Sequence, residues 1–136
     1  MIAALIVVIS LFALLQFFTS YCRSVVAASS KVALSDQVRE VAGIEPSLLR
    51  GDEFRRLLQF VRLCPVSGDD QTEIRFVAAY YRLVRMIRVL SKPLTSGLSS
   101  WAETELDLCA HFAAVTLDRR ISYSRDLLAQ QVGGPV

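Results

Sequence analysis

The first 22 residues, Met1 to Cys22, form an apolar run that contains no Asp, Glu, Lys, Arg or His. As a helix rising about 1.5 Å per residue, this run would measure about 33 Å, enough to cross a hydrocarbon core of about 30 Å. The alternative, a cleaved signal peptide, needs a basic N-terminal region and a small-residue cleavage site close behind the apolar core. Only Met1 precedes the core, and the best cleavage candidate, at residues 26–28, lies well beyond it. Segment 1–22 is therefore predicted to be an uncleaved transmembrane anchor.

The rest of the chain has the composition of a soluble domain, because all 15 basic and 13 acidic residues follow the anchor. Three widely spaced cysteines rule out a disulfide scaffold and suit a reducing compartment. Basic residues flank the anchor only on its C-terminal side, at Arg23, Lys31 and Arg39. By the positive-inside rule, we expect the N-terminus outside and the remaining domain in the cytoplasm.

Hydropathy after the anchor follows a helical period, and no stretch alternates with the two-residue period of a strand. We expect a helical extension and linker over 23–50, an α-helical bundle over 51–132 and a frayed tail over 133–136. The extension is able to continue the anchor helix directly. The predicted fold class is all-α, with one N-terminal transmembrane helix followed by a small cytoplasmic bundle of three to four helices.

The first bundle helix is expected to begin after Gly51 with Asp52 as its N-cap, and to end before Pro65. Its apolar face consists of Phe54, Leu57, Leu58 and Val61. The next helix should begin at acidic residues 69–73 and end before Pro93, because proline cannot continue a helix. Its predicted apolar face consists of Phe76, Tyr80, Leu83, Val84, Ile87 and Leu90.

The last helix is expected to open with Ser100 and Glu103 in capping-box spacing and to extend as far as Gln131. Apolar side chains occupy more than half of its circumference, which is typical of the central helix of a bundle. Incomplete coverage of apolar surface in so small a bundle favours a partner subunit or a second copy.

The strongest feature that packing does not explain is a basic face on the helix over 69–92. Its members are Arg75, Tyr81, Arg82, Arg85, Arg88 and Lys92, and the preceding helix adds a second basic strip at Arg55 and Arg62. Such a face is able to lie against anionic lipid headgroups, dock an acidic protein surface or bind nucleic-acid phosphates. A net charge of only +2 and the absence of a helix-turn-helix or zinc-finger pattern argue against nucleic acid. A solvated face is the plain alternative.

The sequence contains few residues capable of catalysis. His111 is the single histidine, and it follows Asp107 by four residues, the spacing of a metal half-site or an oriented base. No second half-site is visible, and Cys109 is only two residues away, on a different helical face. We therefore predict no catalytic residue, no metal site, no cofactor and no enzyme, with a His111–Asp107 site as the remaining catalytic alternative.

Two polar positions near the anchor invite a functional interpretation. Gln16 places an amide within the apolar run, where it is able to bond a partner helix or reach toward the headgroups. Cys22, at the predicted interface, stands where palmitoylation occurs, and an unmodified or buried thiol is the alternative.

Taken together, these features predict a non-catalytic single-pass membrane protein that acts as a subunit, adaptor or assembly factor of a membrane complex. Its expected partners are the lipid bilayer and either other proteins or a second copy of itself. The alternative is a membrane-tethered regulator that binds an anionic ligand or nucleic acid through the arginine-rich face.

Overall fold

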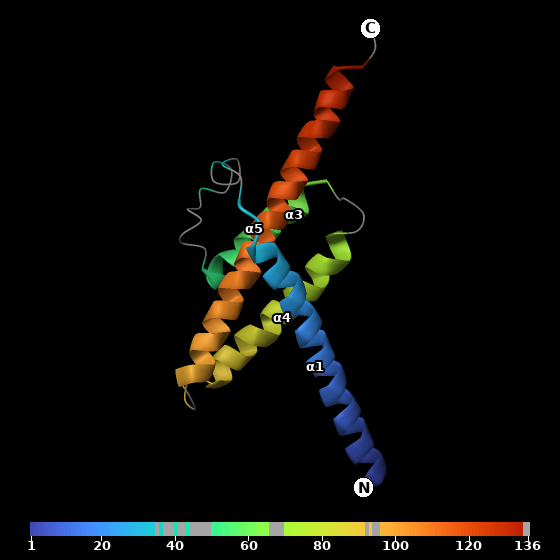
Figure 1. Ribbon diagram of the computed structural model, residues 1–136, viewed down its shortest axis with the longest axis vertical. Coiled ribbons are helices and arrows are strands. Elements are labelled where there is room, and N and C mark those ends of the chain that lie inside the picture. The colour runs from blue at the N-terminus through green and yellow to red at the C-terminus, as the bar shows by residue number, and fades with distance from the viewer. Residues whose placement is uncertain are drawn as a thin grey trace.

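The computed structural model describes residues 1–34, 36, 40, 43, 50–65, 70–91, 93 and 96–134. Its elements are α1 (Ile2–Ser30), the 3-10 turn η2 (Gly51–Glu53), α3 (Phe54–Leu63), α4 (Asp70–Ser91) and α5 (Ser96–Val132) (Figure 1). No strand occurs in the part of the chain that the structure describes, so the predicted all-α class is confirmed.

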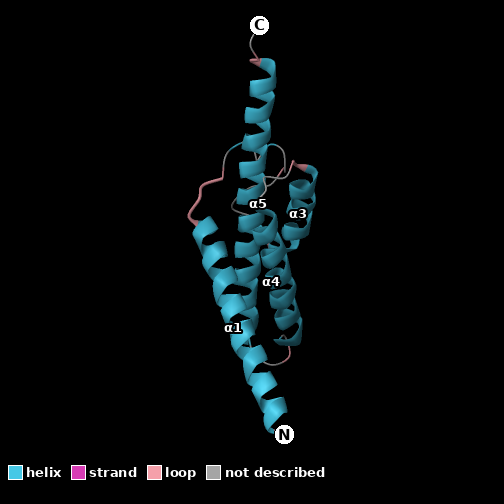
Figure 2. Cartoon of the chain, turned by 90° about the vertical axis from the view of Figure 1, so that its right-hand side faces the viewer, coloured by secondary structure: helices cyan, strands magenta, loops and turns pink. Residues whose placement is uncertain are grey.

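The longest helix, α5, is the central element of the bundle and packs against α1, η2, α3 and α4 (Figure 2). Between Ala102 and Arg120 it is buried on most sides, as its broad apolar surface predicts. The predicted capping box is wrong, because the helix already begins at Ser96. Ser100 therefore lies inside α5, where its carbonyl accepts a hydrogen bond from Thr104 Oγ1 at 3.1 Å.

The segment predicted to be an anchor does not stop at Cys22 but continues as one helix to Ser30. Its residues up to Phe17 are exposed, whereas Cys22, Val26 and Ser29 are buried. These buried residues follow the i, i+4, i+7 spacing of one helical face, which packs against α4 and α5. The expected continuation of the anchor helix is confirmed to Ser30, and most of segment 31–49 lies outside the described residues.

The short helix α3 buries Phe54, Leu57 and Val61, as its sequence period predicts. It ends at Leu63 because Cys64 is extended ahead of Pro65. The predicted N-cap role of Asp52 is wrong, since this residue lies within η2 and the N-terminus of α3 has no side-chain capping bond.

The helix α4 ends before Pro93 as predicted, but its buried face is rotated from the predicted one. The residues that it buries are Val77, Tyr80, Tyr81, Val84 and Ser91. Phe76 is 41% exposed and Leu90 62% exposed, although both were expected on the inner face. The rotation follows from Tyr81, whose ring stacks on Phe54 with centroids 4.2 Å apart and turns that side of α4 toward α3.

Candidate docking surface

The predicted basic face of α4 is only partly exposed. Arg75, Arg82 and Arg85 are exposed on α4, as are Arg55 and Arg62 on α3. Lys92 lies outside the described residues. The placement of Tyr81 on this face is wrong, because its side chain is buried and its hydroxyl donates to the Gly51 carbonyl oxygen at 2.8 Å. Burial also raises the pKa of Tyr81, so the phenol remains a neutral donor.

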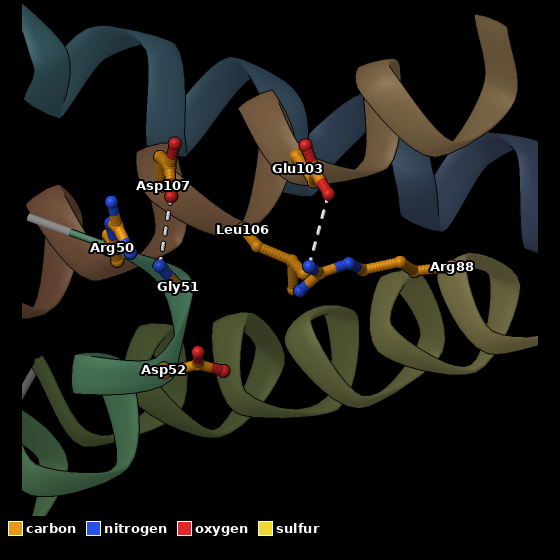
Figure 3. Close-up of a pocket in the computed structure, with 7 residues that line it drawn as sticks. All are labelled: Arg50, Gly51, Asp52, Arg88, Glu103, Leu106 and Asp107. Carbon is orange, nitrogen blue, oxygen red and sulfur yellow. Dashed lines mark hydrogen bonds and ion pairs between the residues drawn. The ribbon is translucent and has the colours of Figure 1, made fainter. Parts of the chain in front are cut away.

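Arg88 is half-buried and faces a carboxylate on the neighbouring helix. Its Nη2 lies 3.1 Å from Glu103 Oε1, so α4 and α5 are joined at this point (Figure 3). The pair borders a cavity of about 300 Å³ that is lined by Arg50, Gly51, Asp52, Arg88, Glu103, Leu106 and Asp107. Because cations and carboxylates line this cavity together, it does not select a ligand of one charge. Arg88 is paired with Glu103 and therefore does not belong to the exposed basic face.

Gly51 lines this cavity and forms hydrogen bonds with both neighbouring helices. Its backbone N–H donates to Asp107 Oδ1 at 2.9 Å, as Figure 3 shows. Its carbonyl oxygen accepts the Tyr81 hydroxyl, so η2 is tied to both α4 and α5. The role of Asp107 is therefore to bind a backbone amide from a segment 56 residues away in sequence.

The histidine and the nearby cysteine do not combine into a catalytic pair. His111 Nε2 lies 3.3 Å from the Val32 carbonyl oxygen, whereas Asp107 binds Gly51. Cys109 is buried, and desolvation together with the Glu105 carboxylate raises its pKa to about 12. Its thiol is therefore protonated at neutral pH and inaccessible. Among the described residues, no three His, Cys, Asp or Glu side chains lie close enough together to hold a metal ion.

A different cavity brings the two predicted basic strips together. Arg62 from α3 and Arg75 from α4 both line a hollow of about 330 Å³. Arg120 of α5, which sequence reasoning missed, lines the same hollow and is buried. The signal in the sequence was its position three residues after Leu117 and four after Thr116, both of which are buried and uncharged. Arg55, Arg82 and Arg85 do not line this cavity.

An apolar groove of about 620 Å³ lies where α1 meets the start of α4. Its lining consists of Leu11, Leu14, Leu15, Phe17, Phe18, Tyr21 and Phe76. The Phe76 ring lies 6.0 Å from that of Phe18 and 6.1 Å from that of Tyr21. The groove is therefore built from exposed α1 side chains on one wall and a single aromatic ring of α4 on the other.

Gln16 and Cys22 lie in different surroundings on α1. Gln16 is exposed along with the apolar side chains around it. Cys22 is fully buried, with its sulfur 3.8 Å from the Phe76 carbonyl oxygen. Burial makes Cys22 a poor acceptor for a lipid chain and favours the buried-thiol alternative.

The most apolar stretch of α1 has no buried residue, and this helix is long and apolar enough to cross a membrane. No protein-family model matches the chain, and no curated protein or solved structure is significantly similar to it. Function is therefore inferred from the residues and contacts of this chain.

Proposed function

We propose that this protein is a single-pass membrane protein whose helical bundle docks a partner as a non-catalytic subunit, adaptor or assembly factor of a membrane complex. The observation that carries the proposal is the division of α1 into two parts. Its exposed apolar residues up to Phe17 suit lipid, while Cys22 and Val26 belong to the core of the bundle. An anchor of this kind fixes the orientation of the bundle relative to the membrane, because no flexible linker separates them.

A docking region for the partner is offered by the end of α5. Beyond Arg120 the helix leaves the bundle, and it projects at the end of the molecule opposite the N-terminus of α1 (Figure 1). Its exposed apolar side chains are Tyr123, Leu127, Leu128 and Val132. Tyr123 and Leu127 are four residues apart, as are Leu128 and Val132, so each pair lies on one side of the helix, and exposed apolar pairs of this kind are able to bind a hydrophobic groove or another helix.

The cations after the apolar run support a cytoplasmic bundle. Arg23 and Lys31 follow the exposed apolar part of α1, and by the positive-inside rule basic residues favour the cytoplasmic side. A non-catalytic role is supported by the surroundings of His111 and Cys109, because Nε2 of His111 lies 3.3 Å from a backbone carbonyl oxygen and the Cys109 side chain lies in the core.

Introducing arginine at Val8 and Phe12 is expected to abolish membrane insertion. Each charge near the centre of a spanning helix costs about 2.5–3.5 kcal/mol, and both side chains are exposed, so the bundle itself should still fold. Alkaline extraction of membranes should leave the wild type in the pellet and release the Val8→Arg/Phe12→Arg variant. Gln130→Arg, on the exposed end of α5, serves as the matched control and should stay in the pellet. Release of the wild-type chain at alkaline pH would contradict the proposal that α1 is an anchor.

The orientation is tested separately by adding protease to inverted vesicles. A tag at the C-terminus of the protein should be cleaved if the bundle is cytoplasmic.

If a partner docks on α5, the wild-type protein extracted in mild detergent should form a particle that contains this chain and its partner in a fixed ratio. Leu128→Glu should release the partner, because it places a charge in the exposed apolar pair Leu128 and Val132, while Gln130→Glu should retain it. Native mass spectrometry of the intact particle gives the subunit count. A particle that contains one copy of this chain and nothing else would contradict the proposal.

The second candidate function, a membrane-tethered regulator that binds an anionic ligand, is favoured by one observation, the three arginines around a single cavity. Saturable binding of a small anion by the full-length protein would support it. A regulator that binds nucleic acid has less support than one that binds a small anion, because the overall charge is only +2 and Arg88 forms an ion pair with Glu103.

A further inference from the structure

Arg120 is a buried cation whose hydrogen bonding is incomplete. Its residue is 3% exposed, and Nη1 donates to the Val61 carbonyl oxygen at 2.7 Å. Its Nε is buried without a hydrogen-bond partner. No carboxylate within the described part of the chain forms an ion pair with it. A buried guanidinium normally has an anionic partner, because taking the charge out of water is unfavourable.

The cavity beside Arg120 gathers further positive charge. Arg62 at the end of α3 and Arg75 on α4 line the same space of about 330 Å³. Among the lining residues that the structure describes, Gln71 supplies the remaining polar side chain and no acid is present. Three guanidinium groups around one cavity repel one another unless an anion lies between them.

The cavity also has an apolar side. Leu58 of α3 and Ile74 of α4 contribute to its wall, so a ligand with a hydrocarbon portion would fit better than a bare ion. Arginine forks bind phosphate and carboxylate oxygens through paired N–H donors. Against three guanidinium charges, a phosphate monoester with about two negative charges is a better match than a single carboxylate.

We propose that the cavity formed by Arg62, Arg75 and Arg120 binds the phosphate group of a monoester that carries an apolar substituent. Arg120 binds from the buried side with the donor that lacks a partner, and the two exposed arginines bind from the open side. The apolar wall contacts the substituent.

Two sources supply this chemistry, a soluble phosphate ester and the headgroup of a lipid such as phosphatidic acid. Arg75 is adjacent to Phe76, whose ring lies against Phe18 and Tyr21 at the end of the apolar run. This position is near the headgroups if α1 is the anchor, so the lipid source depends on the proposed function, whereas phosphate binding does not.

The test uses the full-length protein in a neutral detergent, titrated with dihexanoyl phosphatidic acid and separately with inorganic phosphate. Arg62→Gln/Arg75→Gln is expected to weaken binding of dihexanoyl phosphatidic acid at least about tenfold, because each lost bond is charge-assisted. The matched control is Arg55→Gln/Arg82→Gln, which also removes one exposed arginine from α3 and one from α4. It should leave the dissociation constant within about twofold of wild type, as these residues lie outside the cavity.

Arg120→Met provides an independent readout. The removed charge has no acidic partner among the described residues, but the Val61 carbonyl oxygen loses its donor, so the variant should remain folded with a melting temperature near that of wild type, yet lose binding. Added phosphatidic acid should raise the wild-type melting temperature and leave that of Arg120→Met unchanged. If Arg120→Met fails to fold, the two double variants still decide the result.

Binding of both probes indicates recognition of the phosphate itself, and binding of the short-chain lipid alone indicates a lipid ligand; either outcome supports the site. Saturation by neither probe, or equal loss of affinity in both double variants, would overturn it. Because these measurements are made in detergent, a failure of membrane insertion would be seen separately by alkaline extraction and would leave them interpretable.

Discussion

Replacing Arg23 by methionine is expected to lower the free energy of unfolding by about 3 kcal/mol. Arg23 Nε lies 3.1 Å from Oε1 of Glu105, and the Tyr80 hydroxyl donates to Oε2 of the same carboxylate at 3.0 Å. Arg23, Glu105 and Tyr80 belong to α1, α5 and α4, so one buried carboxylate joins α1 to both of the helices that it packs against. The Glu105 side chain is 5% exposed and that of Arg23 is 57% exposed. Removing the arginine therefore leaves a buried charge without its cation.

The expected value lies at the lower end of the range for broken buried pairs, because solvent screens the exposed arginine and Tyr80 still donates to the carboxylate. Methionine preserves most of the apolar stem of the arginine and removes the guanidinium, whose carbon lies 6.0 Å from the centroid of the Trp101 ring. Charge loss is thus separated from packing loss. The measurement is thermal or denaturant unfolding of the full-length protein in mild detergent.

A second substitution tests whether the loss of stability comes from the unpaired Glu105 carboxylate or from weaker packing of the bundle. Arg23→Met/Glu105→Gln should recover most of the lost stability, since the amide is neutral and its oxygen still accepts the Tyr80 hydroxyl. Glu103→Gln, which removes the more exposed ion pair with Arg88, should cost less than about 1 kcal/mol. If the double variant were as unstable as Arg23→Met alone, the carboxylate would not be the cause.

Local signals in the sequence were enough to predict the helices and much of the core. Proline rules placed the ends of α3 and α4 before Pro65 and Pro93. The period of α3 identified Phe54, Leu57 and Val61 as its buried face, and the broad apolar surface of α5 identified it as central. These features depend on residues within one or two turns of one another, which is the range over which periodicity is informative.

Contacts between distant segments were not predictable in the same way. The buried face of α4 depends on where Tyr81 finds an acceptor, and that acceptor is the Gly51 carbonyl, 30 residues earlier. The binding cavity depends on Arg120, which a helical wheel of α5 places on the inner face without showing which charges it meets. A helical wheel assigns a side chain to a face, but it does not identify the neighbouring helix or the polar atoms that the neighbour presents.

The junction at Gly51 leads to the second large effect, since Gly51→Ala is expected to lower the free energy of unfolding by about 2–3 kcal/mol. A Cβ atom at this position would lie 2.5 Å from Leu106 Cβ, closer than two non-bonded carbon atoms approach in proteins. Both atoms are attached directly to backbone, so the clash is relieved only by moving η2 away from α5. That movement stretches the bonds from Gly51 N–H to Asp107 and from Tyr81 to the Gly51 carbonyl oxygen. The glycine is therefore required for close approach of two backbones.

Gly97→Ala is the matched control, because a Cβ atom added there meets nothing within 4 Å. Gly97 lies in the first turn of α5, so alanine should leave stability unchanged or raise it by up to about 1 kcal/mol. Asp107→Asn measures the hydrogen-bond contribution without the clash, since the amide oxygen still accepts the Gly51 N–H, and it should cost less than Gly51→Ala. Equal unfolding midpoints for Gly51→Ala and wild type would mean that η2 does not approach α5 as closely as described.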